Sequence, residues 1–399
     1  MKVLIFVSGN SQPIYLNIKK ALDIQFNDVE IIFNCAIINV KAKILNLQSR
    51  DIAIFSDYFF TEFSRLEFEL VMRKAACKKV SIGFDDEYFL SSSLYLANFM
   101  DAWITFDLVT YEYMRQLGIE VFNVPHPVHI EKGEADSIQY IHDVSFIGYV
   151  KSSKGDRRSF LESIAIAFPN NFIPGLKDKY LSFEEMIHAY RHTKVNLNLT
   201  SITINNPDAI NIPYQSARHG FKGRPFEIGG AGGFCLSEYS PSINKFLKSG
   251  EHIDYFRNKE EAINKIKTYV ENEEMRIQVA NRLHNWVAIN CSPESDNNLF
   301  LKCIMEIQNS DGQYQTSDLG NALPVYPFEC RRANHHFFIM KNLKLFFTTL
   351  KDIFNLPRNR HKPYGLVFLK LISSIFMDNL NLFLLSISRK GMQFKNNKK

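Results

Sequence analysis

The regular alternation of short apolar runs with helical segments constrains the fold of this chain more than any other feature of its sequence. Residues 2–8 (KVLIFVS) form an apolar run that ends in a Gly-Asn-Ser turn, as expected of a strand buried on both faces of a parallel sheet. Further strand runs lie at 29–38, 51–55, 79–84 and 101–106, with helical spacing at 14–26 and 62–77. This repeat predicts a doubly wound, open α/β sheet.

The pattern restarts after a polar stretch that divides the chain. Residues 131–140 (EKGEADSIQY) lack apolar periodicity, and a new strand run begins at Asp143. We therefore predict two Rossmann-like domains, at 1–130 and 143–310, joined by a linker at 131–142. A second linker at 311–330 is expected to lead into a basic helical tail at 331–399.

The composition suits two ordinary domains and excludes several other classes of protein. The 399 residues are 46% hydrophobic and 22% charged, which is enough to build two α/β cores. The six cysteines form no Cys-x-x-Cys pair and have no histidine at metal-ligand spacing, which predicts buried thiols in a reducing compartment and no metal site. The first apolar run is too short for a signal peptide, so we expect a cytoplasmic protein.

Residues 221–238 (FKGRPFEIGGAGGFCLSE) contain the most informative local motif. Lys222 and Arg224 come before a short helical segment that carries Glu227, and a run of small residues then leads into an apolar strand. Glycine lets a backbone approach a ligand closely, and a helix N-terminus offers amide donors and a positive dipole end. The motif is typical of a site for a phosphorylated ligand. An arginine paired with a surface carboxylate beside a simple αβ turn would leave the same pattern.

The order R-P-F-E-I, a small-residue turn ending in G-G-F, a strand, and then G-E-H-I-D-Y-F resembles the C-terminal half of the CgeB-like glycosyltransferases. The similarity extends over residues 143–290, and these enzymes belong to the GT-B class, in which two Rossmann-like domains face each other across a cleft. The resemblance implies a nucleotide-diphosphate sugar as the donor, no cofactor and no metal. It also implies that Glu227 binds the ribose and that the following turn approaches the nucleotide. Many retaining members have another glutamate where this chain has His219, so the stereochemical outcome stays open.

A cluster of cations next to this turn suits a diphosphate. Arg218, His219, Lys222 and Arg224 lie within seven residues, and such a cluster can stabilise the developing charge of a leaving group. In the resembling family an arginine is common shortly after the first strand of the second domain, so Arg157 or Arg158 is expected to reach phosphate. Either residue also suits an exposed helix start. The donor-binding residues that we predict are Glu227, Arg224, Lys222, His219, Arg218, Gly229, Gly230, Gly232, Gly148, Arg157 and Asn198.

Catalytic residues are expected after the strands of the first domain, because ligands of open α/β sheets lie at the carboxyl ends of the strands. Asp85 and Asp86 follow the fourth strand run, and His126 lies in a Pro-His-Pro turn near the end of the domain. Either acid could take a proton from an acceptor hydroxyl. The same acids also suit the cap of the helix that follows, and the run Asp85-Asp86-Glu87 leaves a metal-using alternative open.

The tail differs from the rest of the chain in charge. From Arg331 onward there are 14 basic and 2 acidic residues, against 33 basic and 40 acidic residues before it. The apolar segment 364–388 is interrupted by Lys370, Asp378 and two asparagines, so it does not qualify as a transmembrane helix. Aromatic and basic residues on one helix favour the anionic inner face of a membrane. The alternative is a helical pair that packs on the body or on a second subunit, as in a homodimer.

We therefore expect a glycosyltransferase that moves a sugar from a nucleotide-diphosphate sugar to a hydroxyl acceptor on a glycan, glycolipid or protein, in cell-envelope polysaccharide or glycolipid synthesis. The alternative is a nucleotide-sugar-binding or scaffold subunit without turnover, an idea to which His219 gives weight. Nucleic-acid binding is disfavoured because the body is acidic and the tail is rich in aliphatic residues. A dehydrogenase is disfavoured because no G-x-G-x-x-G turn follows the first strand.

Overall fold

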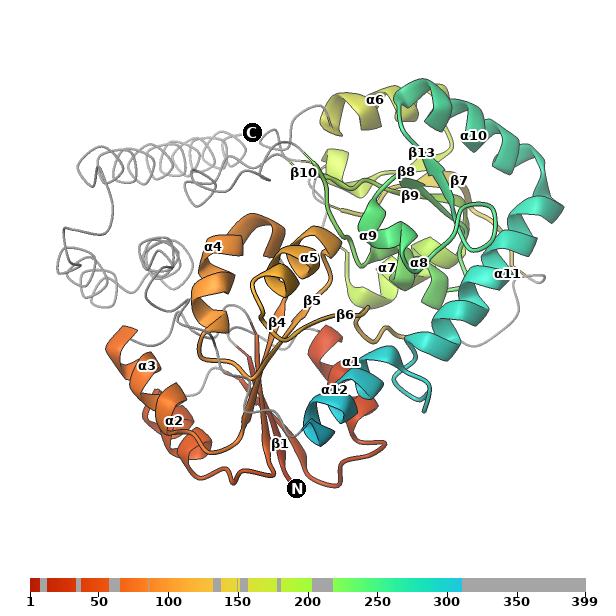
Figure 1. Ribbon diagram of the computed structural model, residues 1–399. Coiled ribbons are helices and arrows are strands. Elements are labelled where there is room, and N and C mark those ends of the chain that lie inside the picture. Colours follow the sequence, from red (N-terminus) through yellow and green to blue (C-terminus); the bar gives the residue numbers. More distant parts are fainter. Residues whose placement is uncertain are drawn as a thin grey trace, which may run out of the picture.

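The protein, described here from a computed structural model, contains two parallel β-sheets with helices packed on them (Figure 1). The structure describes residues 1–7, 13–33, 37–56, 65–84, 86–131, 138–148, 150, 157–177, 181–202 and 218–310. The predicted α/β class with two Rossmann-like sheets is confirmed. The second linker and the basic tail lie outside the described residues, and the domain boundaries stay predictions.

The first sheet has six parallel strands in the order β2-β1-β3-β4-β5-β6. These strands are β1 (Val3–Val7), β2 (Val29–Phe33), β3 (Ile52–Ser56), β4 (Lys78–Gly83), β5 (Ala102–Thr105) and β6 (Val121–Asn123). All residues of β1 and β3 are buried, because the sheet is covered on both faces. The strand order changes direction between β1 and β3, which is where an open sheet of this kind forms a crevice.

Alternate residues of β1 belong to two different cores. Leu4 and Phe6 join a core with α2 (Ile37–Leu45), α3 (Arg65–Lys74), α4 (Asp86–Ala97) and α5 (Leu108–Gln116). Val3 and Ile5 face the opposite way, toward α1 (Pro13–Leu22) and α12 (Leu299–Asn309). Because side chains alternate between the faces of a strand, one short apolar run contributes to both cores.

The second sheet has five parallel strands in the order β13-β12-β9-β7-β8. These strands are β7 (His142–Ser145), β8 (Asn171–Phe172), β9 (Thr193–Asn198), β12 (Cys235–Glu238) and β13 (Asp254–Phe256). One face packs against α6 (Arg157–Ala167), α10 (Lys259–Glu271) and part of α11 (Glu273–Asn290). The other packs against α7 (Phe183–Arg191), α8 (Arg224–Gly230) and α9 (Pro241–Asn244). A two-stranded antiparallel ladder, β10 (Ser201–Ile202) with β11 (Arg218–His219), lies beyond the end of β9.

The two halves of the chain share one hydrophobic core. This core extends from the α1 face of the first sheet to the α7 and α8 face of the second, and α12 returns from the second half to lie beside α1 (Figure 1). Lys78 of β4 donates hydrogen bonds to the carbonyl oxygens of Ile307, Gln308 and Ser310 at 2.7, 2.7 and 2.5 Å, and so caps the C-terminus of α12. A late helix of the chain thus packs on the first sheet.

Four cysteines are buried free thiols, namely Cys77, Cys235, Cys291 and Cys303, as the sequence predicted. Burial raises the pKa of Cys77 to about 11, so this thiol is protonated at neutral pH. Within the part of the chain that the structure describes, no helix is both long enough and apolar enough to cross a membrane.

The contact between Lys78 and α12 gives a test of how the two halves are joined. Lys78→Met removes a charged donor from three helix-terminal carbonyl groups, and we expect it to lower the free energy of unfolding by about 2 kcal/mol in urea denaturation. Lys74→Met, at an exposed position near the end of α3, is the matched control and should change the free energy of unfolding little. Equal effects of the two substitutions would show that the cap does not hold α12 in place.

Candidate functional site

The carboxyl ends of the strands in the second sheet meet around one crevice. From β7 the chain passes to β8 on one side and then to β9 on the other, so the direction of the strand order changes between β7 and β9. In open α/β sheets this is the point where ligands bind. The ends of β7 and β9 are therefore the place to look for a site.

Arg224 lies at this point and contacts the ends of both strands. It is the first residue of α8, and its Nη1 donates to Oδ1 of Asn198 at 2.8 Å. Its guanidinium carbon lies 5.0 Å from the ring centre of Phe146. A Cβ atom added to Gly148 would lie 2.6 Å from Nη2 of Arg224, so a side chain there would displace the guanidinium. The structure thus brings together three residues that the sequence assigned to the donor site.

The glycines at the end of α8 and just after it have different structural roles. A Cβ atom at Gly229 would meet Leu283 and Val287 of α11 at 2.8 Å, and one at Gly230 would lie 2.2 Å from the carbonyl oxygen of His129. The close approaches that the structure shows at these two positions are therefore to protein atoms. Gly232 has a φ of +80°, which ends α8 in the left-handed conformation. Binding of a nucleotide by this turn stays a prediction.

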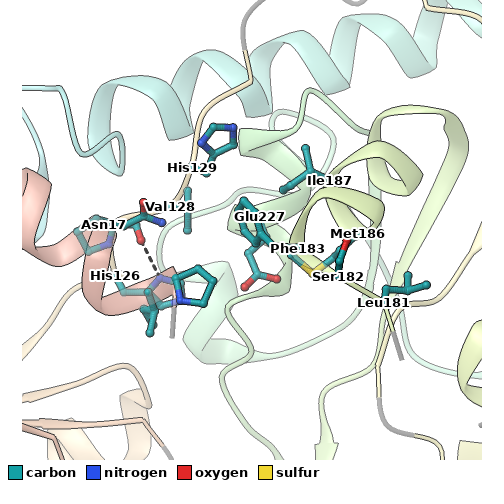
Figure 2. Close-up of a pocket in the computed structure, with 13 residues that line it drawn as sticks. Asn17, His126, Val128, His129, Leu181, Ser182, Phe183, Met186, Ile187 and Glu227 are labelled. Carbon is teal, nitrogen blue, oxygen red and sulfur yellow. Dashed lines mark hydrogen bonds between the residues drawn. The ribbon is translucent and has the colours of Figure 1, made fainter. Parts of the chain in front are cut away.

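Glu227 faces a cavity of about 440 Å³ between the two halves of the chain (Figure 2). Residues from α1, the segment after β6, the start of α7 and α8 line this cavity, and most of their side chains are apolar. The lining residues are Pro13, Ile14, Asn17, His126, Pro127, Val128, His129, Leu181, Ser182, Phe183, Met186, Ile187 and Glu227. Burial raises the pKa of Glu227 above its usual value, and the positive charge of Arg224 offsets part of this shift.

His126 reaches the same cavity from the first half of the chain. Its Nδ1 lies 3.2 Å from the carbonyl oxygen of Pro127, which can only accept, so Nδ1 carries the proton and Nε2 has a lone pair. Burial lowers the pKa of His126 to about 4, so the imidazole is neutral at pH 7. A Cβ atom at Gly223, the residue before α8, would lie 2.4 Å from Nε2 of His126. His126 therefore meets α8 at its N-terminus.

The structure describes only one of the two predicted catalytic acids, Asp86. Asp85 lies outside the described residues. Asp86 begins α4 and is buried, and its carboxylate accepts hydrogen bonds from Ser93 Oγ at 2.5 Å and from Trp103 Nε1 at 2.9 Å. These contacts hold Asp86 inside the first domain, in the helix-start position that the sequence offered as the alternative.

Two of the remaining predicted cations contact the segment just after β9. Arg157 begins α6, is 8% exposed, and donates from Nη2 to the carbonyl oxygen of Ser201 at 3.0 Å. Lys222 is half-buried in the segment that leads into α8. His219 belongs to β11, and its Nδ1 lies 3.1 Å from Oγ1 of Thr200. Arg218 precedes it in β11, but the placement of its side chain lies outside the described part of the structure.

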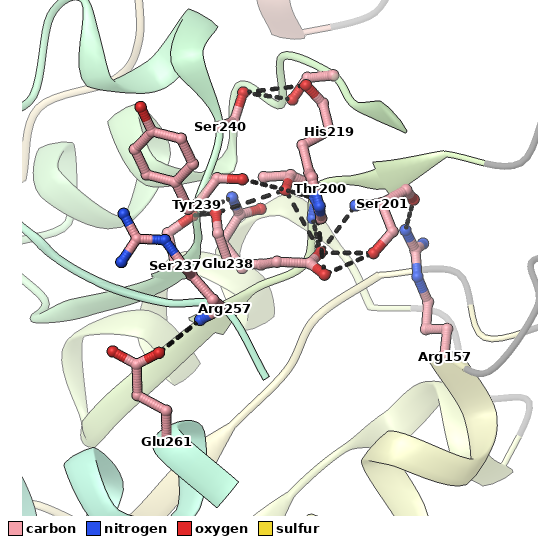
Figure 3. A network of polar contacts seen from close by, with 12 residues as sticks. Arg157, Thr200, Ser201, His219, Ser237, Glu238, Tyr239, Ser240, Arg257 and Glu261 are labelled. Atoms are coloured by element: carbon pink, nitrogen blue, oxygen red, sulfur yellow. Dashed lines mark hydrogen bonds and ion pairs between the residues drawn. The ribbon is translucent and has the colours of Figure 1, made fainter. Parts of the chain in front are cut away.

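One polar residue at this edge of the sheet escaped the sequence analysis. Glu238 ends β12, and its carboxylate accepts hydrogen bonds from the backbone nitrogens of Thr200 and Ser201, both at 2.8 Å (Figure 3). The signal was present, since Glu238 directly follows an apolar strand run and the carboxyl ends of strands carry ligands. Its partners lie almost forty residues earlier in the chain, so no local pattern could reveal the network.

No group of three or more His, Cys, Asp or Glu side chains among the described residues could hold a metal ion. Asp85, one member of the acidic run that left a metal-using alternative open, is not among those residues. Independence from metal therefore stays a prediction.

Comparison with known proteins finds one matching family and several similar structures. Residues 161–290 match the protein family described as glycosyl transferase-like. No curated protein sequence matches the chain. Among solved structures, Anabaena HepE in complex with UDP is similar to this chain, with a TM-score of 0.52 and 11% sequence identity, over 77% of this chain and 100% of the other.

Two further complexes of Anabaena HepE give the same result. The complex with UDP-glucose has a TM-score of 0.51 at 11% identity and covers 77% of this chain and 100% of the other. The complex with UDP and glucose has a TM-score of 0.53 at 12% identity and covers 78% of this chain and 100% of the other. Similarity at this identity shows the fold, and the predicted GT-B arrangement is confirmed.

The environment of Glu227 predicts how stability depends on pH. Because burial raises the pKa of Glu227, ionisation of this group costs folding free energy, and the cost grows as the pH rises from the pKa of the unfolded chain to that of the folded protein. Glu227→Gln should therefore raise the free energy of unfolding at pH 8, and this gain should vanish below about pH 4. Urea denaturation at both pH values measures it.

Glu271→Gln, at an exposed position near the end of α10, is the control and should show no gain that grows with pH. A loss of stability in Glu227→Gln at pH 8 would mean that the protein holds the ionised carboxylate favourably, against the expected cost of burial.

Proposed function

We propose that this protein is a glycosyltransferase that moves a sugar from a nucleotide-diphosphate sugar to a hydroxyl acceptor. The observation that carries the proposal is the position of Glu227 in a cavity of about 440 Å³, one helical turn from Arg224 at the crevice between β7 and β9. A cavity of this size is typical of small-ligand sites. The match of residues 161–290 to a glycosyl transferase-like family and the fold shared with HepE support the same conclusion.

The cavity suits the nucleoside of the donor. Its apolar walls, with Ile14, Val128 and Phe183, offer surfaces on which the faces of a base can pack. The carboxylate of Glu227 can accept hydrogen bonds from the two hydroxyl groups of a ribose, because an ionised carboxylate has acceptors on both oxygens. Binding the ribose would also satisfy a carboxylate that is costly to leave buried alone.

The diphosphate then belongs at the crevice next to Arg224. The donor passes from the ribose at Glu227 to the guanidinium one turn earlier on the same helix, which can hold phosphate oxygens by two parallel hydrogen bonds. Arg157 and Lys222 add positive charge at the same edge of the sheet. Cations fixed in place before the reaction stabilise the charge that develops on the departing nucleotide diphosphate.

The first domain is proposed to supply the acceptor surface. His126 is neutral at pH 7, and its Nε2 lone pair can accept a hydrogen bond from a sugar hydroxyl near the N-terminus of α8. A group with a pKa of about 4 is a weak base, so His126 suits positioning better than removal of the acceptor's proton. Asp85 remains the predicted residue for that proton.

The finer features of the reaction rest on the resemblance and on the tail. We propose a CgeB-like enzyme that needs no metal and acts in cell-envelope polysaccharide or glycolipid synthesis. It would work in the cytoplasm, with the basic tail on the inner face of the membrane or on a second copy of the chain. The acceptor would be a glycan, a glycolipid or a protein hydroxyl.

Ligand-induced stabilisation tests the donor site directly. We expect one of UDP-, GDP- or TDP-sugars at one hundred times its dissociation constant to add about 2.7 kcal/mol to the stability of the wild type, and a CMP-sugar, which lacks the diphosphate, to add less. Arg224→Met and Glu227→Ala should abolish this gain. Arg158→Met is the control, because Arg158 is exposed and pairs with Glu162 at 2.9 Å, and it should keep the full gain.

Two other outcomes would change the conclusion. A wild-type protein that no nucleotide sugar stabilises would contradict the proposed function. A nucleotide sugar that binds in dependence on Glu227, but is neither hydrolysed nor used with any acceptor, would favour the alternative of a scaffold subunit that holds the donor without turnover.

A further inference from the structure

Glu238 is the centre of a polar network at the carboxyl edge of the second sheet (Figure 3). Besides the two backbone nitrogens of the turn after β9, its carboxylate accepts from the hydroxyl of Ser201 at 2.6 Å and from that of Thr200 at 3.3 Å. The side chain of Glu238 is 14% exposed. A carboxylate with this many donors is held in one orientation, and it holds the turn in return.

The imidazole of His219 is directed into this network. Its Nδ1 lies 3.1 Å from Oγ1 of Thr200 and 3.6 Å from Oε1 of Glu238. The hydroxyl of Thr200 and Nδ1 of His219 therefore share a hydrogen bond, and the carboxylate of Glu238 lies beside both groups. With Nδ1 facing the protein, the ring offers Nε2 as its other polar atom.

The side chain of His219 does little to hold the fold at this point. The backbone of its segment is fixed by other groups, since Gly220 donates its N–H to the carbonyl of Thr200 at 3.0 Å and accepts from Ser240 Oγ at 3.0 Å. The imidazole itself is 45% exposed. Among the described residues Nε2 has no hydrogen-bond partner, so an oriented ring presents a polar atom to the outside.

The network shares its backbone with the proposed donor site. Thr200 lies two residues after Asn198, and the segment of His219 continues directly to Arg224. Asn198 and Arg224 are themselves joined by a hydrogen bond of 2.8 Å. Arg157 holds the carbonyl of Ser201 from a third direction. His219 therefore lies at the same edge as the cations that we assign to the diphosphate.

We propose that His219 contacts the sugar-diphosphate part of the bound donor through Nε2, and that Glu238 is a positioning residue that acts through Thr200 and His219. This inference rests on the proposed function and names two residues of that site. Glu238 does not touch the donor in this account. Glu238 should affect donor binding only through the imidazole of His219. A residue that merely holds the turn would affect donor binding without His219.

A double-mutant cycle separates these two roles. Glu238→Gln keeps the size of the side chain and one acceptor oxygen, and His219→Gln keeps a polar side chain. We expect each to weaken the binding of UDP-glucose or GDP-mannose, whichever the wild type binds, by about tenfold in isothermal titration. The double variant should also lose about tenfold and not about a hundredfold, because both changes remove one coupled contact.

Two further variants serve as a control for the cycle and as a replacement for Glu238→Gln. Glu261→Gln is the control, since Glu261 accepts from the backbone of Arg257 at 2.9 Å on another helix, and it should bind the donor as the wild type does. Should Glu238→Gln fail to fold, Thr200→Val takes its place in the cycle. It removes the hydroxyl that orients Nδ1 of His219 and keeps the shape of the side chain, and it should show the same loss and the same coupling.

The contradicting outcomes are distinct. Unchanged affinity in His219→Gln, with binding that still depends on Glu227, would overturn this inference and leave the proposed function in place. Losses that multiply in the double variant would show that Glu238 holds the turn without acting through His219, and would overturn it as well. A wild type that binds neither nucleotide sugar, nor any other of the donor panel, would overturn the proposed function together with this inference.

Discussion

The insertion of Arg224 between the ends of β7 and β9 is the contact on which the rest of the site depends. It anchors the N-terminus of α8 against Asn198 and against a glycine that leaves room for the guanidinium. Since residues three apart share a helix face, the same anchor sets where Glu227 points, which is into the cavity. The cation that we propose for the phosphates and the acid that we propose for the ribose are thus carried on one turn of helix.

The site is complete only because the two halves of the chain are held together. Gly229 and Gly230 let α8 lie against α11 and against the carbonyl of His129, so the second sheet comes close to the segment after β6. That segment brings His126 to the start of α8, and α12 returns to pack on the first sheet. Glycines at the end of α8 therefore contribute to the candidate site through packing, by bringing residues from both halves of the chain to one cavity.

The sequence predicted the features that depend on neighbouring residues and missed those that depend on distant ones. Buried parallel strands are continuous apolar runs, so both sheets could be recognised, and Arg224 and Glu227 lie in one short motif. Trp103 as a partner of Asp86 could not be foreseen, nor could the backbone of Thr200 as a partner of Glu238, because hydrogen bonds between separate elements leave no local pattern. The tight packing of Gly229 and Gly230 against protein atoms also required the tertiary structure.

The central claim is that the cavity at Glu227 holds the nucleoside and that Arg224 holds the diphosphate. A crystal structure of the full chain in complex with the nucleotide diphosphate that stabilises it most would test this claim directly. The account predicts a ribose whose hydroxyl groups donate to Glu227, a base between α1 and α7, and phosphate oxygens on Arg224. A nucleotide bound elsewhere, with the cavity empty and Arg224 still on Asn198, would contradict it.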